Sequence, residues 1–290
     1  MTGLQPGFWF GGLRIQLGDL MLGEVDDAGV HWHCATLDGW DSPEVRSEVT
    51  AREGDHGAWA SPAYLGERPI TLAGKLIAPS VAAADDAIDR LLTAASLTDT
   101  TLTVHETVPK QATVRRSGKP LAKRLTGTVI EWSVLVTAAD PRRYSTVLQT
   151  GMTGLPSTAG GLTVPYSVPY LLDAVTVAGQ IDAKNRGNFE TRPVFTIVGP
   201  VSQPQVLTQM PDGSVRILTY GLDLAAGEDL VIDTDAHSVT LTGGVSRRRF
   251  LSAPSGWPVI PSGAMVSFQF RAATYSSTAR LTARWRSAWM

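Results

Sequence analysis

Short runs in which apolar and polar residues alternate recur along almost the whole chain, and they limit the folds open to it. Gly, Asp and Pro stand between the runs, so each run predicts a short strand that ends in a turn. The runs are GLRIQLGD, VHWHCATLD, EVRSEVTA, RPITLAGKLIA, DTTLTVHE, QATVRRS, the long RLTGTVIEWSVLVTAAD, TRPVFTIVG, SVRILTYG, EDLVIDTD, HSVTLTGG, SRRRFLS, AMVSFQFRA and TARLTARWRSAW. The sequence therefore predicts a mainly β protein. In the longest run, Gly127 is expected to mark a bulge.

One segment departs from this pattern. In SVAAADDAIDRLLTAASL, residues 80–97, Ser80 is suited to cap a helix, and the two acids Asp85 and Asp86 come early, where the helix dipole favours anions. Apolar residues recur with helical spacing at Val81, Ala84, Ile88, Leu91 and Leu92. We expect one helix here.

The chain has 290 residues, a length typical of two domains, and its 43% hydrophobic residues suffice for ordinary cores. A stretch rich in Gly, Pro, Ser and Thr divides it. We therefore predict an N-terminal domain over residues 1–145, a linker or extended arm over 146–172, and a β-sandwich of seven or more strands over 173–290.

The charge argues against a general nucleic-acid binder. The formal net charge is −2 and the sequence pI is about 6.2, whereas such proteins are usually strongly basic. Residues 1–140 hold 12 Lys and Arg against 18 Asp and Glu, net −6, and the remainder hold 13 against 9, net +4. The two halves are thus expected to face different surroundings.

A membrane span, a signal peptide and a disulfide framework are not expected. No apolar run approaches the length of a membrane span, and the N-terminus lacks a signal-peptide pattern. Cys34 is the single cysteine, so no intrachain disulfide can form.

The polar and aromatic segment AREGDHGAWASPAY, residues 51–64, is the first candidate site. A catalytic interpretation would use His56 as a base oriented by Asp55, although adjacent side chains usually point apart. Alternatively, Trp59 and Tyr64 pack beneath their own loop. In the third interpretation the loop reaches a neighbouring subunit, since aromatic residues are enriched in interfaces.

Three other groups have two interpretations each. His31 and His33 share a strand face as metal ligands would, or they form the polar face of a strand whose other face carries Trp32 and Cys34. Asp233 and Asp235 bind calcium or belong to a turn. The remaining group, Arg247 to Arg249, forms a polyanion patch or a solvated sheet face with Arg247 and Arg249 on one side.

Recognised catalytic motifs are absent from the sequence. No GxxxxGK[ST], GxSxG, HExxH or CxxC pattern occurs. A hydrolase would rest on scattered His and Asp residues, so a non-enzymatic protein without cofactor or metal is predicted.

Several segments resemble the distal tail proteins of long-tailed siphophages. In the first half these are GDHGAW, YLGERPITLAGKLIA and DPRRY, and in the second half NRGNFETRPVFTIVGPV, EDLVIDT, SRRRFL, WPVIPSG and a C-terminal WR. The resemblance covers nearly the whole chain and depends on the order of these motifs.

This resemblance implies a structural virion protein at the tail tip, assembled in the host cytoplasm. Such a protein forms a hexameric hub that joins the tail tube to the tip or baseplate, with an N-terminal ring domain and C-terminal galectin-like sandwiches. The implied partners are five further copies, the tail-tube protein, the tail-tip hub protein and the tape-measure protein. DNA would pass through an acidic lumen without specific binding, and no membrane is involved. The residues expected in subunit contacts are His56, Trp59, Tyr64, Arg68, Arg142 and Arg143. For the two arginines at 142 and 143, pairing within their own domain remains the alternative.

A galectin-like sandwich also raises a second function, that of a carbohydrate-binding module for host cell-surface glycans. Trp257, between Gly256 and Pro258, is the candidate for stacking on a sugar. The alternative is a structural anchor at the sandwich edge, because a fold alone implies no sugar site.

Overall fold

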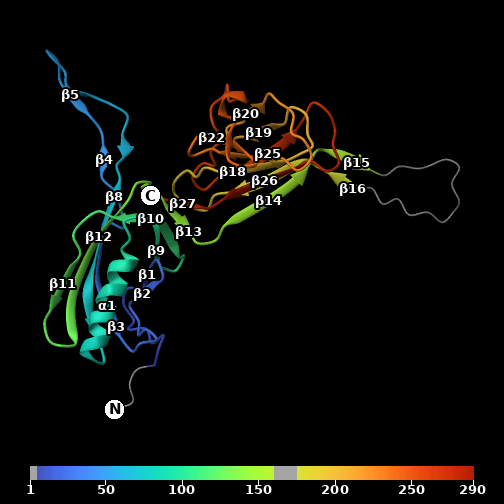
Figure 1. The fold of residues 1–290 in the computed structure, drawn as a ribbon. Helices are drawn as coiled ribbons and strands as arrows, with labels where there is room; N and C mark the ends of the chain where they lie inside the picture. Colours follow the sequence, from blue (N-terminus) through green and yellow to red (C-terminus); the bar gives the residue numbers. More distant parts are fainter. Residues whose placement is uncertain (1–4, 160–174) are drawn as a thin grey trace, which may run out of the picture. The chain divides into compact units, whose positions relative to one another are not determined.

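The computed structural model describes residues 5–159 and 175–290. The chain divides into two units, Met1–Thr146 with Met290, and Val147–Trp289 (Figure 1). Part of the predicted linker, residues 160–172, lies outside the described residues. Another part, β14 (Gln149–Gly154), is a strand of the second unit paired with β26, so its assignment to a linker was wrong. The run LQTGMTG, residues 148–154, was assigned to the linker because its glycines are typical of linkers.

The first unit is built on an antiparallel sheet in the order β2-β1-β9-β10-β12-β8-β3, with β11 added beside β12 and β13 beside β10. Its strands are β1 (Ile15–Leu17), β2 (Leu20–Leu22), β3 (His31–Asp38), β8 (Arg68–Ile77), β9 (Thr100–Val104), β10 (Lys110–Arg116), β11 (Leu121–Arg124), β12 (Val129–Ala138) and β13 (Arg143–Ser145). The long predicted run, residues 124–140, thus begins at the last residue of β11 and contains β12, and Gly127 lies in the turn between these strands instead of in a bulge.

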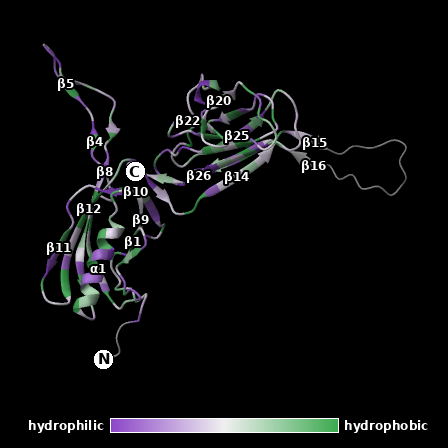
Figure 2. Ribbon diagram, in the orientation of Figure 1, coloured by the Kyte–Doolittle hydropathy of each residue, from purple (hydrophilic) through white to green (hydrophobic). Residues whose placement is uncertain are grey.

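Helix α1 (Val81–Ala94) is confirmed as the single α-helix of the described residues, and it ends three residues before the predicted end. The Ser80 side chain accepts a hydrogen bond from the Ala83 backbone N–H at 3.1 Å, as a cap does. In Figure 2 the helix carries both hydrophilic and hydrophobic segments. Ala84, Ala87 and Leu91 form its buried face, whereas Val81 is 52% exposed.

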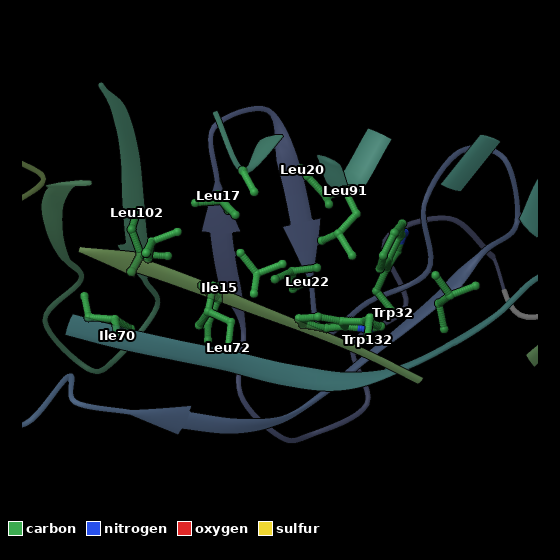
Figure 3. Packing of buried hydrophobic residues seen from close by; sticks show 14 of the residues in the cluster. Ile15, Leu17, Leu20, Leu22, Trp32, Ile70, Leu72, Leu91, Leu102 and Trp132 are labelled. Carbon is green, nitrogen blue, oxygen red and sulfur yellow. The ribbon is translucent and has the colours of Figure 1, made fainter. Parts of the chain in front are cut away.

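The core of the first unit lies between helix and sheet. Figure 3 shows Leu91 of the helix packed near the strand side chains. The rings of Trp32 and Trp132 meet edge to face, with centroids 6.4 Å apart. Leucines and isoleucines of five strands complete the core, among them Ile15, Leu17, Leu22, Ile70, Leu72 and Leu102.

The second unit packs two antiparallel sheets around one core. The first has the order β14-β26-β18-β21-β22-β23 and the second β17-β25-β19-β20-β24. Besides β14, their strands are β17 (Gln180–Lys184), β18 (Val194–Val198), β19 (Gln205–Gln209), β20 (Val215–Tyr220), β21 (Asp229–Asp233), β22 (Ser238–Leu241), β23 (Val245–Ser246), β24 (Leu251–Ser252), β25 (Met265–Arg271) and β26 (Arg280–Trp285). The short strand β27 (Ala288–Trp289) belongs to neither of these two sheets. A separate pair joins β15 (Ser157–Ala159) to β16 (Val175–Val177).

Inward-facing aromatic side chains hold the two sheets together. Phe195 of β18 meets Phe268 of β25 edge to face at 4.9 Å, and both are fully buried. Two packed sheets with alternating burial confirm the predicted mainly β class.

Candidate functional site: an exposed two-stranded ribbon

A two-stranded ribbon interrupts the first unit between β3 and β8. Its strands are β4 (Val45–Arg46) paired with β7 (Tyr64–Leu65), and β5 (Val49–Ala51) paired with β6 (Ala58–Ala60). Backbone and side-chain hydrogen bonds between Glu48 and Ser61 join the two pairs. The ribbon, with β5 near its far end, stands away from β8 and β12 (Figure 1).

Every residue from 44 to 64 is exposed, including four large apolar or aromatic side chains. The exposed fractions are 60% for Val45, 64% for Val49, 67% for Trp59 and 65% for Tyr64. No core backs this ribbon, and an isolated two-stranded ribbon is marginal in water. Clustered apolar exposure of this kind marks an interaction surface.

The tip of the ribbon orders itself through local contacts. The Arg52 guanidinium lies 4.4 Å from the centre of the Trp59 ring and 3.8 Å from the Asp55 carboxylate. Asp55 accepts a hydrogen bond from the backbone N–H of His56 at 2.7 Å, so it does not orient the imidazole as a catalytic pair would. Trp59 and Tyr64 are not packed under their own loop, which leaves the interface interpretation as the one that the geometry favours.

Arg68, at the root of the ribbon, is completely buried. Its Nε donates to the carbonyl of Pro141 at 2.9 Å, and its Nη1 donates to the carbonyls of Gly39, at 3.2 Å, and Trp40. The prediction that Arg68 contacts a neighbouring subunit was therefore wrong: its side chain is enclosed in its own unit.

The charge of Arg68 is retained at neutral pH. Its pKa is lowered to about 10, chiefly by burial and also by the Arg143 guanidinium, while the carboxylates of Asp41 and Asp140 oppose the change. A charged guanidinium with several N–H donors can satisfy three carbonyls at once.

The other two predicted arginines are engaged near the same root. Arg142 donates to Asp140 Oδ1 at 3.1 Å, and the Arg143 guanidinium lies 5.4 Å from the centre of the Trp40 ring. These contacts favour pairing within their own unit, and a role for either arginine between subunits stays a prediction.

Trp40 and Glu106 also secure the root, and sequence reasoning missed both. The Trp40 Nε1 donates to Glu106 Oε1 at 2.6 Å, and Lys110 pairs with the other carboxylate oxygen. Burial by itself would raise the pKa of Glu106, but the hydrogen bonds from Lys110 and Trp40 lower it overall. No motif links residues 66 positions apart, so only the fold could reveal this contact.

The histidine pair on β3 does not assemble a metal site. The His33 ring stacks on Phe10 with centroids 4.2 Å apart. Within residues 5–159 and 175–290 no group of three potential ligands is close enough to hold an ion. Burial raises the pKa of Cys34 to about 11, so its thiol is protonated at neutral pH.

The arginines at 247–249 do not share strand faces as predicted. Arg248–Phe250 forms a short 3-10 turn, η1, between β23 and β24. Asp233 accepts backbone hydrogen bonds from Asp235 and Ala236 at 2.8 and 3.0 Å, which favours the turn interpretation of the two acids.

Trp257 already has partners for its ring. It stacks on the His237 ring at 4.6 Å, and the Arg248 guanidinium lies 4.9 Å from its centre. The ring also packs against the core of the second unit. These contacts favour the structural-anchor alternative.

The second unit matches a known family. Residues 186–289 match the family model described as the siphovirus-type tail component, C-terminal domain. The match, together with the fold likeness below, confirms the predicted resemblance to distal tail proteins.

Solved phage structures share the fold over nearly the whole length. The crystal structure of the phage SPP1 Dit protein, described as a paradigm of hub adsorption apparatus in phages infecting Gram-positive bacteria, has a TM-score of 0.64 at 12% identity. It covers 96% of this chain and 100% of that one. A chain of the phage P2 baseplate in its activated conformation with Ca has a TM-score of 0.51 at 10% identity, covering 94% and 97%.

No curated protein sequence matches the chain. Among the described residues no helix is long and apolar enough to cross a membrane.

Proposed function

We propose that this protein is a non-enzymatic hub subunit of a phage tail, which closes with five copies of itself into a hexameric ring. The observation that carries the proposal is the ribbon of residues 44–64, exposed at every position and backed by no core. Its aromatic and apolar side chains would stabilise the contact between two copies once a neighbouring copy covers them. The family match of the second unit and the Dit-like fold support the tail setting.

Covering the ribbon would release enough free energy to drive assembly. Trp59 is 67% exposed. Burying this exposed part of the side chain would remove on the order of 150 Å² from water, which corresponds to roughly 3–4 kcal/mol of hydrophobic free energy. Tyr64, Val45 and Val49 would add to this. Central aromatic side chains commonly dominate interface energies.

A closed ring needs a second, different patch on each subunit. We place it at the far end of β8 from the ribbon, where Ile77, Val81 and Leu125 are 39%, 52% and 44% exposed. Ile77 ends β8, and Val129, which pairs with it, follows the turn that holds Leu125. A Cβ at Gly127 in that turn would lie 3.3 Å from Val81, so these elements adjoin.

The ring would join the tail tube to the tail tip or baseplate in the virion. One face would stack on the tube protein and the other would receive the tip hub and tape-measure proteins, after assembly in the host cytoplasm. The net charge of −6 over residues 1–140 would let DNA pass the lumen without sticking, because like charges repel.

Light scattering coupled to gel filtration tests the ring. We expect a species of six times the 30.9 kDa chain, alone or after mixing with the tube protein. A strict monomer under both conditions would contradict the proposal. Replacement of Trp59 and of Val81 should each break the ring, and the two variants mixed should not restore a closed one.

A further inference from the structure

A second exposed aromatic residue stands in the second unit, at one end of its sandwich. Tyr275, in the loop between β25 and β26, is 61% exposed. It lies between two depressions of about 560 and 370 Å³, and both are lined by Tyr275, Ser276 and Ser277. The larger is completed by Pro200, Val201, Ser202, Asp223, Leu224 and Thr274, and the smaller by Met152, Thr153, Gly154, Leu155, Ser157 and Arg280.

The loops around the larger depression are fixed to one another. The backbone N–H of Ala273 donates to the carbonyl of Ser202 at 3.0 Å. Asp223 Oδ1 accepts from the Ser202 hydroxyl at 2.7 Å and from the Gln203 N–H at 3.2 Å. Gln203 has a φ of 45°, a left-handed conformation that costs free energy in a non-glycine residue. Asp223 Oδ1 is thus held by two donors of the neighbouring loop, one of them the backbone N–H of this strained residue.

Several polar groups at this place have no partner. Over the described part of the chain, neither the Tyr275 hydroxyl, the side-chain hydroxyls of Thr274 and Ser277, nor Asp223 Oδ2 makes a hydrogen bond. Hydroxyls both donate and accept, and a carboxylate oxygen accepts. A ligand rich in hydroxyl groups would match this set.

From this arrangement we infer that the face around Tyr275 binds a neutral saccharide. One pyranose ring lies on the flat face of Tyr275, which offers an apolar body with a polar tip. Asp223 Oδ2 accepts from a sugar hydroxyl, while Thr274 and Ser277 exchange hydrogen bonds with others. The second depression, on the other side of the same tyrosine, receives the next sugar unit of the chain.

A protein partner fits this face less well. Standard protein interfaces bury about 800 Å² per partner around an apolar centre. Here Met152 is the large apolar side chain exposed beside Tyr275, while the other apolar lining residues Val201, Leu224 and Leu155 are buried and offer little area to a protein partner. The Asp223 carboxylate also disfavours an anionic ligand in the larger depression. The inference goes beyond the hub function and does not depend on it.

The test uses the full chain and an array of neutral oligosaccharides built from glucose, galactose, rhamnose or N-acetylglucosamine. Any saccharide that binds is then followed by saturation-transfer NMR and titration. We expect Tyr275→Ala and Asp223→Asn each to weaken binding about tenfold or more, the effect of losing about 1.4 kcal/mol. Met265→Ala is the matched control, since Met265 is 61% exposed at the other end of β25, and it should bind as the wild type does.

Equal affinity of the wild type and the Tyr275→Ala variant would overturn the inference, as would an array without a single bound saccharide. Loss of tip-protein binding by Tyr275→Ala, with no saccharide bound by the wild type, would assign the face to a protein and overturn it too. The mass of Tyr275→Ala in solution separates the two proposals, because a hub subunit should keep its oligomeric state.

Discussion

The Arg68 guanidinium donates a hydrogen bond to the main-chain carbonyl of Trp40, so the strand that leaves the exposed ribbon holds the segment that enters it. The same side chain reaches the Pro141 carbonyl. A ribbon without a core of its own is thereby set at a defined point of the first unit. The root of the ribbon is thus part of the folded core.

Replacing Arg68 should destabilise the first unit. Arg68→Met would leave the carbonyls of Gly39, Trp40 and Pro141 without their donor, and each buried polar group left unpaired costs roughly 1–3 kcal/mol. We expect a loss of at least about 3 kcal/mol in urea unfolding. Arg52→Met, at the exposed tip, is the control and should stay within about 0.5 kcal/mol of wild type. Equal stability of the two variants would exclude the role assigned to Arg68.

Replacing Trp59 should weaken assembly and leave the fold intact. Trp59→Ala removes the largest exposed side chain of the ribbon, and we expect the subunit contact to lose about 2 kcal/mol or more. Light scattering at falling protein concentration should then show dissociation before the wild type dissociates, with unchanged circular dichroism. Ser47→Ala, at another exposed ribbon position, should behave as the wild type. A Trp59 variant that remains hexameric throughout the dilution would remove this residue from the interface.

Acid should destabilise the first unit through Asp26. Burial alone would raise the pKa of this carboxyl, but hydrogen bonds from Trp32 Nε1, the Val30 N–H and Arg90 lower it below its ordinary value of 3.8. The lowered pKa contributes stability that is complete above 3.8 and is lost as the pH falls through the folded-state value.

The free energy of unfolding should therefore be compared for the wild type and Asp26→Asn between about pH 7 and pH 3. The wild type should be the more stable at neutral pH, and the difference should shrink below the ordinary pKa. The exposed Asp27→Asn is the control. A difference that stays constant with pH would show that the carboxylate charge of Asp26 contributes nothing.

The bulge in β3 depends on Gly74. The pairing of β3 with β8 shifts between Cys34 and Thr36, and a Cβ at Gly74 would lie 1.8 Å from the His33 carbonyl oxygen. Gly74→Ala should cost more than about 4 kcal/mol or prevent folding. Gly12→Ala, where a Cβ meets nothing within 4 Å, should fold normally. Full soluble yield and wild-type unfolding of Gly74→Ala would refute the steric argument.

Local patterns in the sequence predicted much of the fold. Ser80 and the apolar spacing after it identified the helix, because capping and amphipathicity act within one turn or two. The alternating runs identified most strands of both units. The bulge before Thr36, the turn at Gly127 and the pairing of β14 with β26 depend on partners far along the chain, and local patterns do not contain them.

The candidate sites show the same limit. Trp59 and Tyr64 stood out as large aromatic residues among turn-forming ones, and both are exposed. Arg68 was misjudged because arginine is typical of interfaces, and its three carbonyl partners come from segments that only the fold brings together. The sequence around Tyr275 contains no motif that would have singled out this residue. The larger depression beside it is completed by loops more than 50 positions earlier in the sequence, which only the fold brings near.

Because no core lies behind residues 44–64, the side chains of this ribbon are not needed for the subunit to fold. In most interfaces the same residues serve both folding and binding. A substitution in this ribbon leaves the sheet and helix of the subunit untouched, so in the proposed ring it would change only how well one copy matches the next. Under this proposal the ribbon could diverge between related proteins at little cost to folding, and mismatched ribbons alone would then disfavour mixed rings made from two such proteins.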